Sequence, residues 1–286
     1  MTGKLGYAIR TMSRREAEAA ASWARAEGWN PGLRDVDAFF PADPEGFLAG
    51  ALDGRMIASL SAVRYGRAYG FIGFYIVDEP WRGQGHGLAL WRAGMERLKD
   101  IPCVGLDGVL AQEPSYRKSD FASAYRNRRY GGAPPAAART GAEAGLADAR
   151  SIPFGDLLAL DRAMFPAARP GFLAAWISLP GHRALAAVAD GHIAGLGVAR
   201  PCAQGFKIGP LYADDRTVAE RLLGGLCAGM GAGPAFLDVP EVNAEAVALA
   251  RSLGWSVAFE TARMYRGPAP RVDLARLYGV TTFELG

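Results

Sequence analysis

The sequence has few of the residues that hold a secreted or metal-bound domain together. Its 286 residues include only three cysteines, Cys103, Cys202 and Cys227, which lie far apart with neither paired nor metal-like spacing. A disulfide framework is therefore not expected, and an intracellular protein fits this cysteine usage best. We expect no metal cofactor.

Excess charge of one sign and long apolar runs are also scarce. The net charge is only +3, which is too small to indicate a nucleic-acid or a membrane partner. No uncharged apolar run reaches the roughly 20 residues that span a bilayer. Residues 1–6 have no apolar signal core. We therefore expect a cytoplasmic protein without nucleic-acid or membrane partners.

Apolar residues, by contrast, are abundant. Half of the residues are hydrophobic and 21% are charged, so the chain can bury a sizeable core and general disorder is not expected. A length of 286 residues suits one large or two ordinary domains.

The most informative stretch is a glycine-rich loop between an expected strand, 71–77, and an expected helix that starts near His86. Gly83, Gly85 and Gly87 let the backbone approach a ligand closely. The unpaired N–H groups and the dipole of the helix start favour a phosphate, and Arg82 adds a formal charge. Gly87 is followed by Leu88-Ala89, so the Gly-Lys-Ser/Thr end of a nucleotide-hydrolase loop is missing. The spacing also fails the dinucleotide pattern G-x-G-x-x-G.

The residues around this loop predict an alternation of strands and helices. Ser13 and Glu16 have capping-box spacing for a helix that ends at Gly28. Phe39-Phe40-Pro41 is expected in a connection, where it either lines an acceptor pocket or packs in the core. The expected strands of this part are 5–10, 47–52, 56–64, 71–77, 103–106 and 121–130, with a further helix at 113–118.

A second pattern follows a Pro/Gly-rich stretch at 131–141, which indicates an interdomain linker. Residues 190–200 echo the hairpin at 53–64, and a strand, a helix, a strand, a helix and a final strand follow. Repetition of one order indicates a duplicated domain. The expected boundaries are 1–132 for a first domain, 133–147 for a linker and 148–286 for a second domain. The tail from Gly267 to Gly286 has no assignable pattern.

The loop Arg82-Gly83-Gln84-Gly85-His86-Gly87 resembles the Arg/Gln-x-x-Gly-x-Gly/Ala pyrophosphate loop of the GNAT acyltransferases, and Val77 and Pro80 match the residues that precede it. The resemblance implies an α/β (α+β) fold of two tandem GNAT-like domains, each with a mixed, mostly antiparallel sheet flanked by helices. It also implies that CoA binds the first copy. The implied binding residues are Ile76, Val77, Arg82, Gly83, Gln84, Gly85, His86, Gly87 and Leu88.

The same resemblance implies an acid for the leaving group. Tyr116-Arg117-Lys118-Ser119-Asp120-Phe121 resembles the family's Tyr-x-x-x-Gly-Phe, in which the tyrosine protonates the departing CoA thiolate. A phenol with a pKa of about 10 keeps its proton at neutral pH and can pass it to a thiolate with a pKa of about 8.5. Asp120 replaces the family's glycine, which leaves the geometry of this turn open. Asp107 and Glu113 are candidate general bases; the alternative is that each is a solvated or capping carboxylate.

The second copy is expected to be degenerate. Asp214 and Asp215 stand where the phosphate loop should be, and Ala250 occupies the position of the tyrosine. Two carboxylates would repel a pyrophosphate, so this half is expected to pack on the first and to help shape its acceptor groove.

The implied function is acyl-CoA-dependent N-acyl transfer, with acetyl-CoA as cosubstrate and a primary amine of a small molecule as acceptor. The amine attacks directly, and backbone N–H groups of 71–77 polarise the thioester carbonyl. One alternative is a non-catalytic acyl-CoA-binding or interaction module. Another is a peptidyl or aminoacyl transferase, which the absence of a strongly basic face disfavours. The expected partner is the small-molecule acceptor, and a homodimer stays open.

Overall fold

A computed structural model describes residues 6–135, 145–189 and 191–286. Its first half follows the predicted order of strands and helices. The elements of this half are β1 (Ala8–Thr11), α1 (Arg14–Ala26), α2 (Asp35–Ala42), β2 (Phe47–Leu52), β3 (Arg55–Tyr65), β4 (Tyr69–Val77), α3 (His86–Arg97), β5 (Val104–Val109), α4 (Glu113–Arg117) and β6 (Ala122–Gly132).

The second half repeats this order. Its elements are β7 (Leu146–Asp148), α5 (Phe154–Met164), α6 (Pro170–Ser178), β8 (Arg183–Ala189), β9 (His192–Pro201), β10 (Phe206–Ala213), α7 (Arg216–Ala228), β11 (Ala235–Pro240), α8 (Ala244–Ser252), β12 (Ser256–Arg266) and β13 (Leu277–Gly279). The α/β fold with a mixed, mostly antiparallel sheet is confirmed. In the described part of the chain, no helix combines the length and the apolar character needed to cross a membrane.

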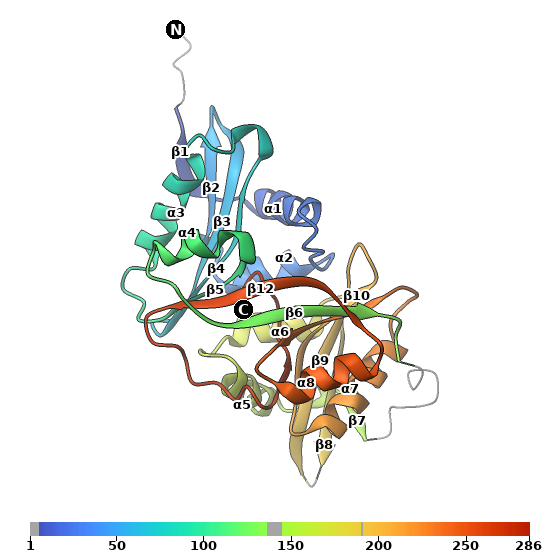
Figure 1. Ribbon diagram of the computed structural model, residues 1–286. Helices are drawn as coiled ribbons and strands as arrows, with labels where there is room; N and C mark the ends of the chain where they lie inside the picture. The colour runs from blue at the N-terminus through green and yellow to red at the C-terminus, as the bar shows by residue number, and fades with distance from the viewer. Residues whose placement is uncertain (1–5, 136–144, 190) are drawn as a thin grey trace.

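Both halves contribute to one continuous sheet, whose strand order is β1-β2-β3-β4-β5-β12-β6-β11-β10-β9-β8-β7. At its centre the two halves exchange their last long strands. β12 lies between β5 and β6, and β6 lies between β12 and β11 (Figure 1). On one side of the β12/β6 pair the order is β5, β4, β3, β2 and β1. On the other side the equivalent strands β11, β10, β9, β8 and β7 follow in the same order. The last long strand of each half is therefore separated from the rest of its own sheet by a strand of the other half.

Two buried ion pairs stand at equivalent places on the exchanged strands. Arg263 of β12 lies opposite Asp107 of β5, and its Nε and Nη2 donate to the two carboxylate oxygens at 2.9 and 2.6 Å. Arg129 of β6 lies opposite Asp238 of β11 and makes the same two-pronged contact at 2.6 and 2.8 Å. Planar guanidinium–carboxylate pairs of this kind fix both register and orientation. Each exchanged strand is thus held by a charge from the strand that receives it.

The core has three parts. One lies under α3 and another under α7 and α8. The third is shared, because α1 and α2 of the first half and α5 and α6 of the second half contribute to it. In this shared core the ring of Phe39 stacks on that of Trp176, with centroids 5.7 Å apart.

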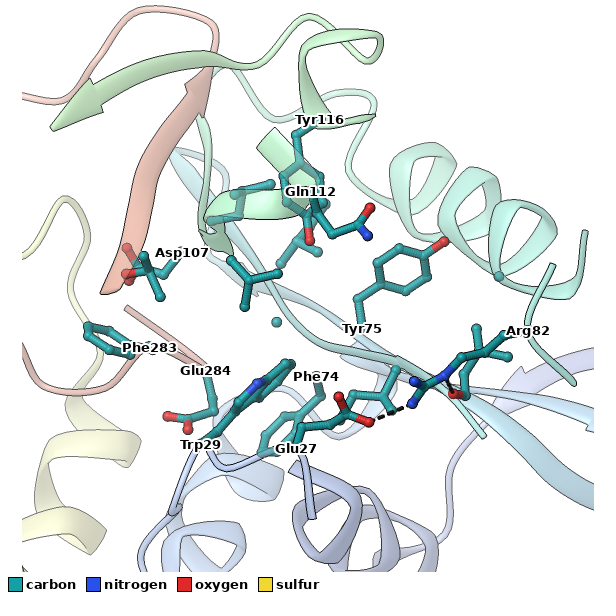
Figure 2. A pocket seen from close by; sticks show the side chains of 18 of the residues that line it. Glu27, Trp29, Phe74, Tyr75, Arg82, Asp107, Gln112, Tyr116, Phe283 and Glu284 are labelled. Atoms are coloured by element: carbon teal, nitrogen blue, oxygen red, sulfur yellow. Dashed lines mark hydrogen bonds and ion pairs between the residues drawn. The ribbon is translucent and has the colours of Figure 1, made fainter. Parts of the chain in front are cut away.

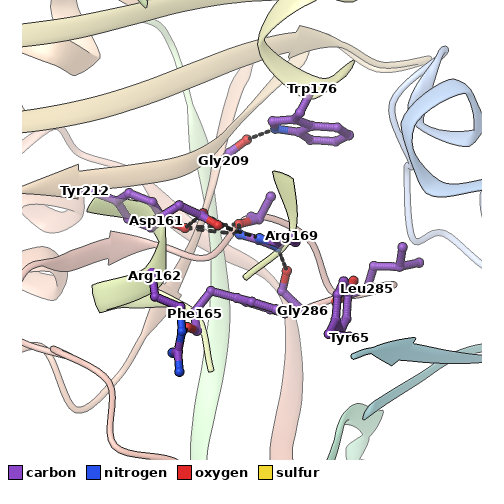
Figure 3. A network of polar contacts seen from close by, with 11 residues as sticks. Tyr65, Asp161, Arg162, Phe165, Arg169, Trp176, Gly209, Tyr212, Leu285 and Gly286 are labelled. Atoms are coloured by element: carbon purple, nitrogen blue, oxygen red, sulfur yellow. Dashed lines mark hydrogen bonds and ion pairs between the residues drawn. The ribbon is translucent and has the colours of Figure 1, made fainter. Parts of the chain in front are cut away.

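A polar network ties the end of the chain to this shared core (Figure 3). Arg169 pairs with Asp161 at 2.9 Å and donates to Thr281 Oγ1 at 2.8 Å and to the Gly286 carbonyl at 3.2 Å. The Tyr65 hydroxyl donates to the Leu285 carbonyl at 2.9 Å. The last ten residues, 277–286, of the tail that the sequence left unassigned are therefore a buried part of the fold.

Three expectations need comment. Phe39-Phe40-Pro41 lies in helix α2, not in a connection, and Phe39 is fully buried core. The prediction of a connection was wrong because Pro41 stands one residue before the end of a short helix, where it interrupts little. Residues 136–144 of the expected linker and Asp190 of the expected hairpin lie outside the described residues, and β7 begins within the expected linker. The boundaries 1–132 and 148–286 stay predictions.

The strand exchange makes a prediction about the isolated halves. A chain that ends at Ala137 lacks β12, so β5 and β6 lose their shared neighbour and the shared core loses α5 and α6. We expect it to aggregate, or to unfold without a cooperative transition, because unpaired edges and apolar surface are exposed. Co-expression with residues 138–286 should restore a soluble complex with a cooperative melt, measured by circular dichroism. A soluble 1–137 fragment that melts cooperatively on its own would contradict the exchange.

Candidate active site

The candidate site is a cavity of about 530 Å³ between two diverging strands. β4 and β5 pair in parallel from Gly70/Val104 to Ile72/Leu106, and the pairing ends there. Beyond this point the cavity is lined by residues 73–77 of β4 and by Asp107 and Val109 of β5. The register between β3 and β4 shifts at the same level, and Phe74 has a φ of +46°. This bulge turns the backbone N–H groups of β4 away from a regular ladder.

The glycine loop forms one end of the cavity. Gly83 and Gly85 have φ values of +75° and +85°, a conformation that residues with a side chain resist. The first hydrogen bond of α3 runs from the Ala89 N–H to the Gly85 carbonyl, so the N–H groups of residues 86–88 precede it and point out of the helix start. A Cβ on Gly87 would lie 2.8 Å from Val77 Cγ2. These features fit a pyrophosphate, which needs converging donors and close backbone approach.

The positive charge of Arg82 is less available to a phosphate in the loop than the sequence indicates. Its Nη2 pairs with Glu27 Oε1 at 2.5 Å, and its Nε donates to the Val77 carbonyl at 2.8 Å (Figure 2). A bound phosphate would therefore compete with Glu27 for Arg82.

Most of the residues expected to bind CoA line this cavity, namely Ile76, Val77, Arg82, Gly83, Gly85, Gly87 and Leu88. Gln84 and His86 are absent from the lining. The Gln84 amide donates to the Pro80 carbonyl at 3.0 Å, and the His86 ring packs 4.6 Å from the ring of Tyr7. The role of these nine residues in binding stays a prediction.

Tyr116 lies on the wall of the same cavity, on the side of α4 (Figure 2). Burial, with a smaller contribution from Tyr75, raises the pKa of Tyr116 to about 12, so the phenol holds its proton at neutral pH. A Cβ on Gly108 would lie 2.4 Å from Tyr116 Cε2, so the tyrosine packs directly on β5. Asp120 adopts a φ of +63°, the left-handed conformation that a glycine would take and that aspartate tolerates. The turn thus keeps its geometry without the glycine.

The two candidate bases are in different environments. Asp107 is buried on the cavity wall, paired with Arg263, and also accepts a hydrogen bond from Asn127 at 2.8 Å. Burial raises the pKa of Asp107 against the opposing effect of Arg263. Its equivalent in the other half, Asp238, pairs with Arg129 in the same way. This equivalence indicates that Asp107 holds the exchanged strand in place. Glu113 is not among the lining residues; hydrogen bonds from Ser123 and Arg117 lower its pKa.

The far end of the cavity is built by residues that the sequence did not single out as site residues. Trp29 follows α1, Phe259 and Thr261 belong to β12, and Phe283 and Glu284 belong to the tail. Figure 2 shows Asp107, Phe283 and Glu284 at the end opposite Arg82. The second half thus supplies a wall of the first half's cavity. No sequence signal marked these residues, because the tail has no periodicity and a strand does not reveal its neighbours.

The equivalent place in the second half is occupied by the protein itself. Asp215 caps α7 by accepting a hydrogen bond from the Val218 N–H at 2.9 Å, where a phosphate would otherwise bind. β13 pairs with β10, and the Val280 N–H donates to the Asp238 carbonyl at 2.9 Å. The space that separates β4 and β5 in the first half is therefore bridged by backbone here. Among the described residues, no group of His, Cys, Asp or Glu side chains is arranged to hold a metal ion.

The loop geometry predicts the effect of a bulky acidic side chain. CoA at a hundred times its dissociation constant should stabilise the wild type by about 2.7 kcal/mol, a visible rise in melting temperature. Gly85→Glu should abolish this rise, because the side chain strains a positive φ and places a carboxylate at the phosphate position. Gly191→Glu, at another positive φ far from the cavity, is the matched control and should keep the shift. A folded Gly85→Glu protein with an unchanged shift would refute the assignment of the loop.

Comparisons with known proteins agree with this geometry. Residues 10–118 match the acetyltransferase (GNAT) family, and residues 157–279 match a second acetyltransferase (GNAT) domain. The holothin acyltransferase of Pseudoalteromonas sp. is 30% identical over 273 residues, covering 95% of this chain and 92% of the relative.

Two solved structures share the fold. One is the structure of a protein from Pyrococcus horikoshii that is assigned as an acetyltransferase. It aligns with a TM-score of 0.82 at 24% identity, over 99% of this chain and 96% of the Pyrococcus chain. A tandem GNAT protein from the clavulanic acid biosynthesis pathway has a TM-score of 0.59 at 15% identity, covering 92% and 99%. The chain therefore belongs to the GNAT acyltransferase family and carries two GNAT domains in tandem.

Proposed function

We propose that this protein transfers an acetyl group from acetyl-CoA to a primary amine of a small molecule. One observation carries the proposal: a single cavity joins the glycine loop, the diverging backbone of β4 and the protonated phenol of Tyr116. These are the three parts that acyl transfer from a thioester needs, namely a pyrophosphate cradle, donors for the carbonyl oxygen and an acid for the leaving sulfur. The name of the Pseudoalteromonas relative supports acyl transfer as the reaction.

Each part has a defined task in the proposed reaction. The N–H groups at the start of α3 hold the pyrophosphate, and those of residues 73–77 face the thioester carbonyl. The C–N bond forms as the C–S bond breaks, without an acyl-enzyme. Tyr116 donates its proton to the departing sulfur. The small net charge gives no support to a nucleic-acid or membrane partner, and the cysteine usage fits a cytoplasmic enzyme.

The second candidate is a non-catalytic acyl-CoA-binding module. Asp215 and β13 fill the groove of the second half, so such a module would have to use the cavity of the first half. A free-thiol assay with acetyl-CoA against a library of primary amines separates the two. Release of CoA that requires an amine indicates the enzyme, and binding without release indicates the module.

Loss of the Tyr116 hydroxyl should slow the acyl-transfer step without weakening acetyl-CoA binding. Tyr116→Phe should lower turnover by about 10²–10⁴-fold, the usual contribution of a general acid, and leave the acetyl-CoA affinity nearly intact. Because the pKa of Tyr116 is raised to about 12, its acid role should persist across an assay from pH 7 to 10.

The matched control is Tyr130→Phe, which removes a buried hydroxyl from the part of the core under α7 and α8. That variant should turn over normally in steady-state kinetics. Wild-type turnover by Tyr116→Phe would show that another group protonates the sulfur.

A further inference from the structure

The carboxylates that line the cavity differ in whether a ligand can reach them. The acidic lining residues are Glu27, Asp107 and Glu284. The side chain of Asp107 is fully buried against Arg263, and both carboxylate oxygens of Glu284 have less than 1 Å² of accessible surface. The side chain of Glu27, by contrast, is 37% exposed. Among the lining residues, Glu27 therefore offers the carboxylate that a ligand in the cavity can reach.

The end of helix α1 holds Glu27 at the cavity. The Trp29 N–H donates to the Ala24 carbonyl at 3.0 Å, and Gly28 before it has a φ of +80°. A left-handed glycine followed by such a backward hydrogen bond is a common way to end a helix. The Trp29 carbonyl also accepts a hydrogen bond from Arg129 Nη1 at 2.6 Å, which fastens this turn to β6. With its backbone fixed, Glu27 changes partners by turning its side chain.

Glu27 also stands where a positive group is favoured. It is the residue that ends α1, and the C-terminus of a helix carries partial negative charge on its unpaired carbonyl groups. The carboxylate adds to this charge. In the structure Arg82 supplies the cation, with its Nη2 at 2.5 Å from Glu27 Oε1. Figure 2 shows the side chain of Glu27 reaching from beside Trp29 toward Arg82.

A bound CoA would take this cation away. Arg82 is the first residue of the glycine loop, and the hydrogen bond from its Nε to the Val77 carbonyl keeps its guanidinium beside the loop. A pyrophosphate carries more negative charge than one carboxylate, so it attracts Arg82 more strongly than Glu27 does. The same pyrophosphate repels Glu27. The carboxylate is then left at the negative end of a helix without its counter-charge.

We propose that CoA binding releases Glu27 from Arg82, and that the freed carboxylate receives the acceptor as its ammonium ion. The inference rests on the proposed function and adds the residue that selects a cationic acceptor. This contact governs binding; the attack itself needs the neutral amine, which forms when the ammonium proton passes to water. The two substrates then bind cooperatively. CoA opens the site for the cation and, by reciprocity, the cation strengthens CoA binding by the same factor.

CoA binding without an acceptor tests the release of Glu27. In isothermal titration calorimetry of the full chain, Glu27→Gln should bind CoA about two- to fivefold more tightly than the wild type, the range that loss of a competing, partly exposed ion pair allows. This gain should shrink in an Arg82→Gln background, where no ion pair has to be broken. Glu18→Gln is the matched control. It removes a carboxylate from an exposed pair on the same helix, outside the cavity lining, and should leave CoA affinity unchanged.

Amine binding tests the new partner of Glu27. The probe is benzylamine, because the aromatic ring of Trp29 beside Glu27 suits an ammonium on an apolar body, and benzyl alcohol is the neutral control. We expect the wild type to bind benzylamine at least about tenfold more tightly when it is saturated with CoA than when it is free of CoA. Benzyl alcohol should show little difference between the two states. Glu27→Gln should lose this coupling and bind benzylamine about 10- to 100-fold more weakly in the CoA-saturated state, the usual loss for a hydrogen bond to a charged group.

Both titrations can overturn the inference. If Arg82 binds the phosphate through Nη1 and keeps Glu27, Glu27→Gln will leave CoA affinity unchanged. If Glu27 instead orients Arg82 for the phosphate, Glu27→Gln will weaken CoA binding. Benzylamine binding that does not depend on CoA, or that is absent in both states, would refute the role of Glu27 toward the acceptor.

The failure of this inference is distinct from that of the proposed function. Amine-dependent release of CoA from acetyl-CoA by Glu27→Gln at the wild-type rate and KM would remove only the inference. Loss of the CoA-induced melting shift in the wild type, or no release of CoA with any primary amine, would overturn the proposed function itself.

Discussion

Two guanidinium–carboxylate pairs at the centre of the sheet hold the rest of the structure in place. Arg263 of β12 grips Asp107 of β5, and Arg129 of β6 grips Asp238 of β11, each through two parallel hydrogen bonds inside the protein. Removing one partner of such a pair typically costs about 3–5 kcal/mol, because the other charge stays buried. The pairs therefore fix the register of each exchanged strand, but because they are equivalent they do not by themselves select which strand enters which half. The exchanged strands in turn bring the tail to the first half's cavity.

This arrangement explains why one half could lose its own site. In the second half, Asp215 caps the helix that would hold a phosphate, and β13 bridges the strands that would hold the acyl carrier. From β13 the same tail continues to the first half, where Phe283 and Glu284 complete the far end of the cavity. The C-terminal segment thus closes the groove of the second half with β13 and lines the cavity of the first half with the residues that follow. The second half is part of the catalytic architecture although its own groove is filled.

The sequence predicted which residues of the first half line the cavity better than it predicted how the two halves join. The glycine loop and Tyr116 could be predicted because each belongs to a short motif of contiguous residues at fixed spacing. The exchange of β6 and β12 was not, since the alternation of a strand shows which face is buried but not which strand lies beside it. Phe283 and Glu284, which line the cavity, were missed because the tail that contains them has no periodicity. Glu113 was singled out for its place at a helix start, where it pairs with exposed Arg117.

Two GNAT domains in one sheet should provide a single CoA site. Isothermal titration calorimetry of the full chain with CoA measures the number of usable sites, irrespective of the acceptor. The structure predicts one CoA per chain, bound where α3 begins beside the diverging β4 and β5. A stoichiometry of two would refute a single site, since CoA would have to displace both the Asp215 cap and β13 from the second half.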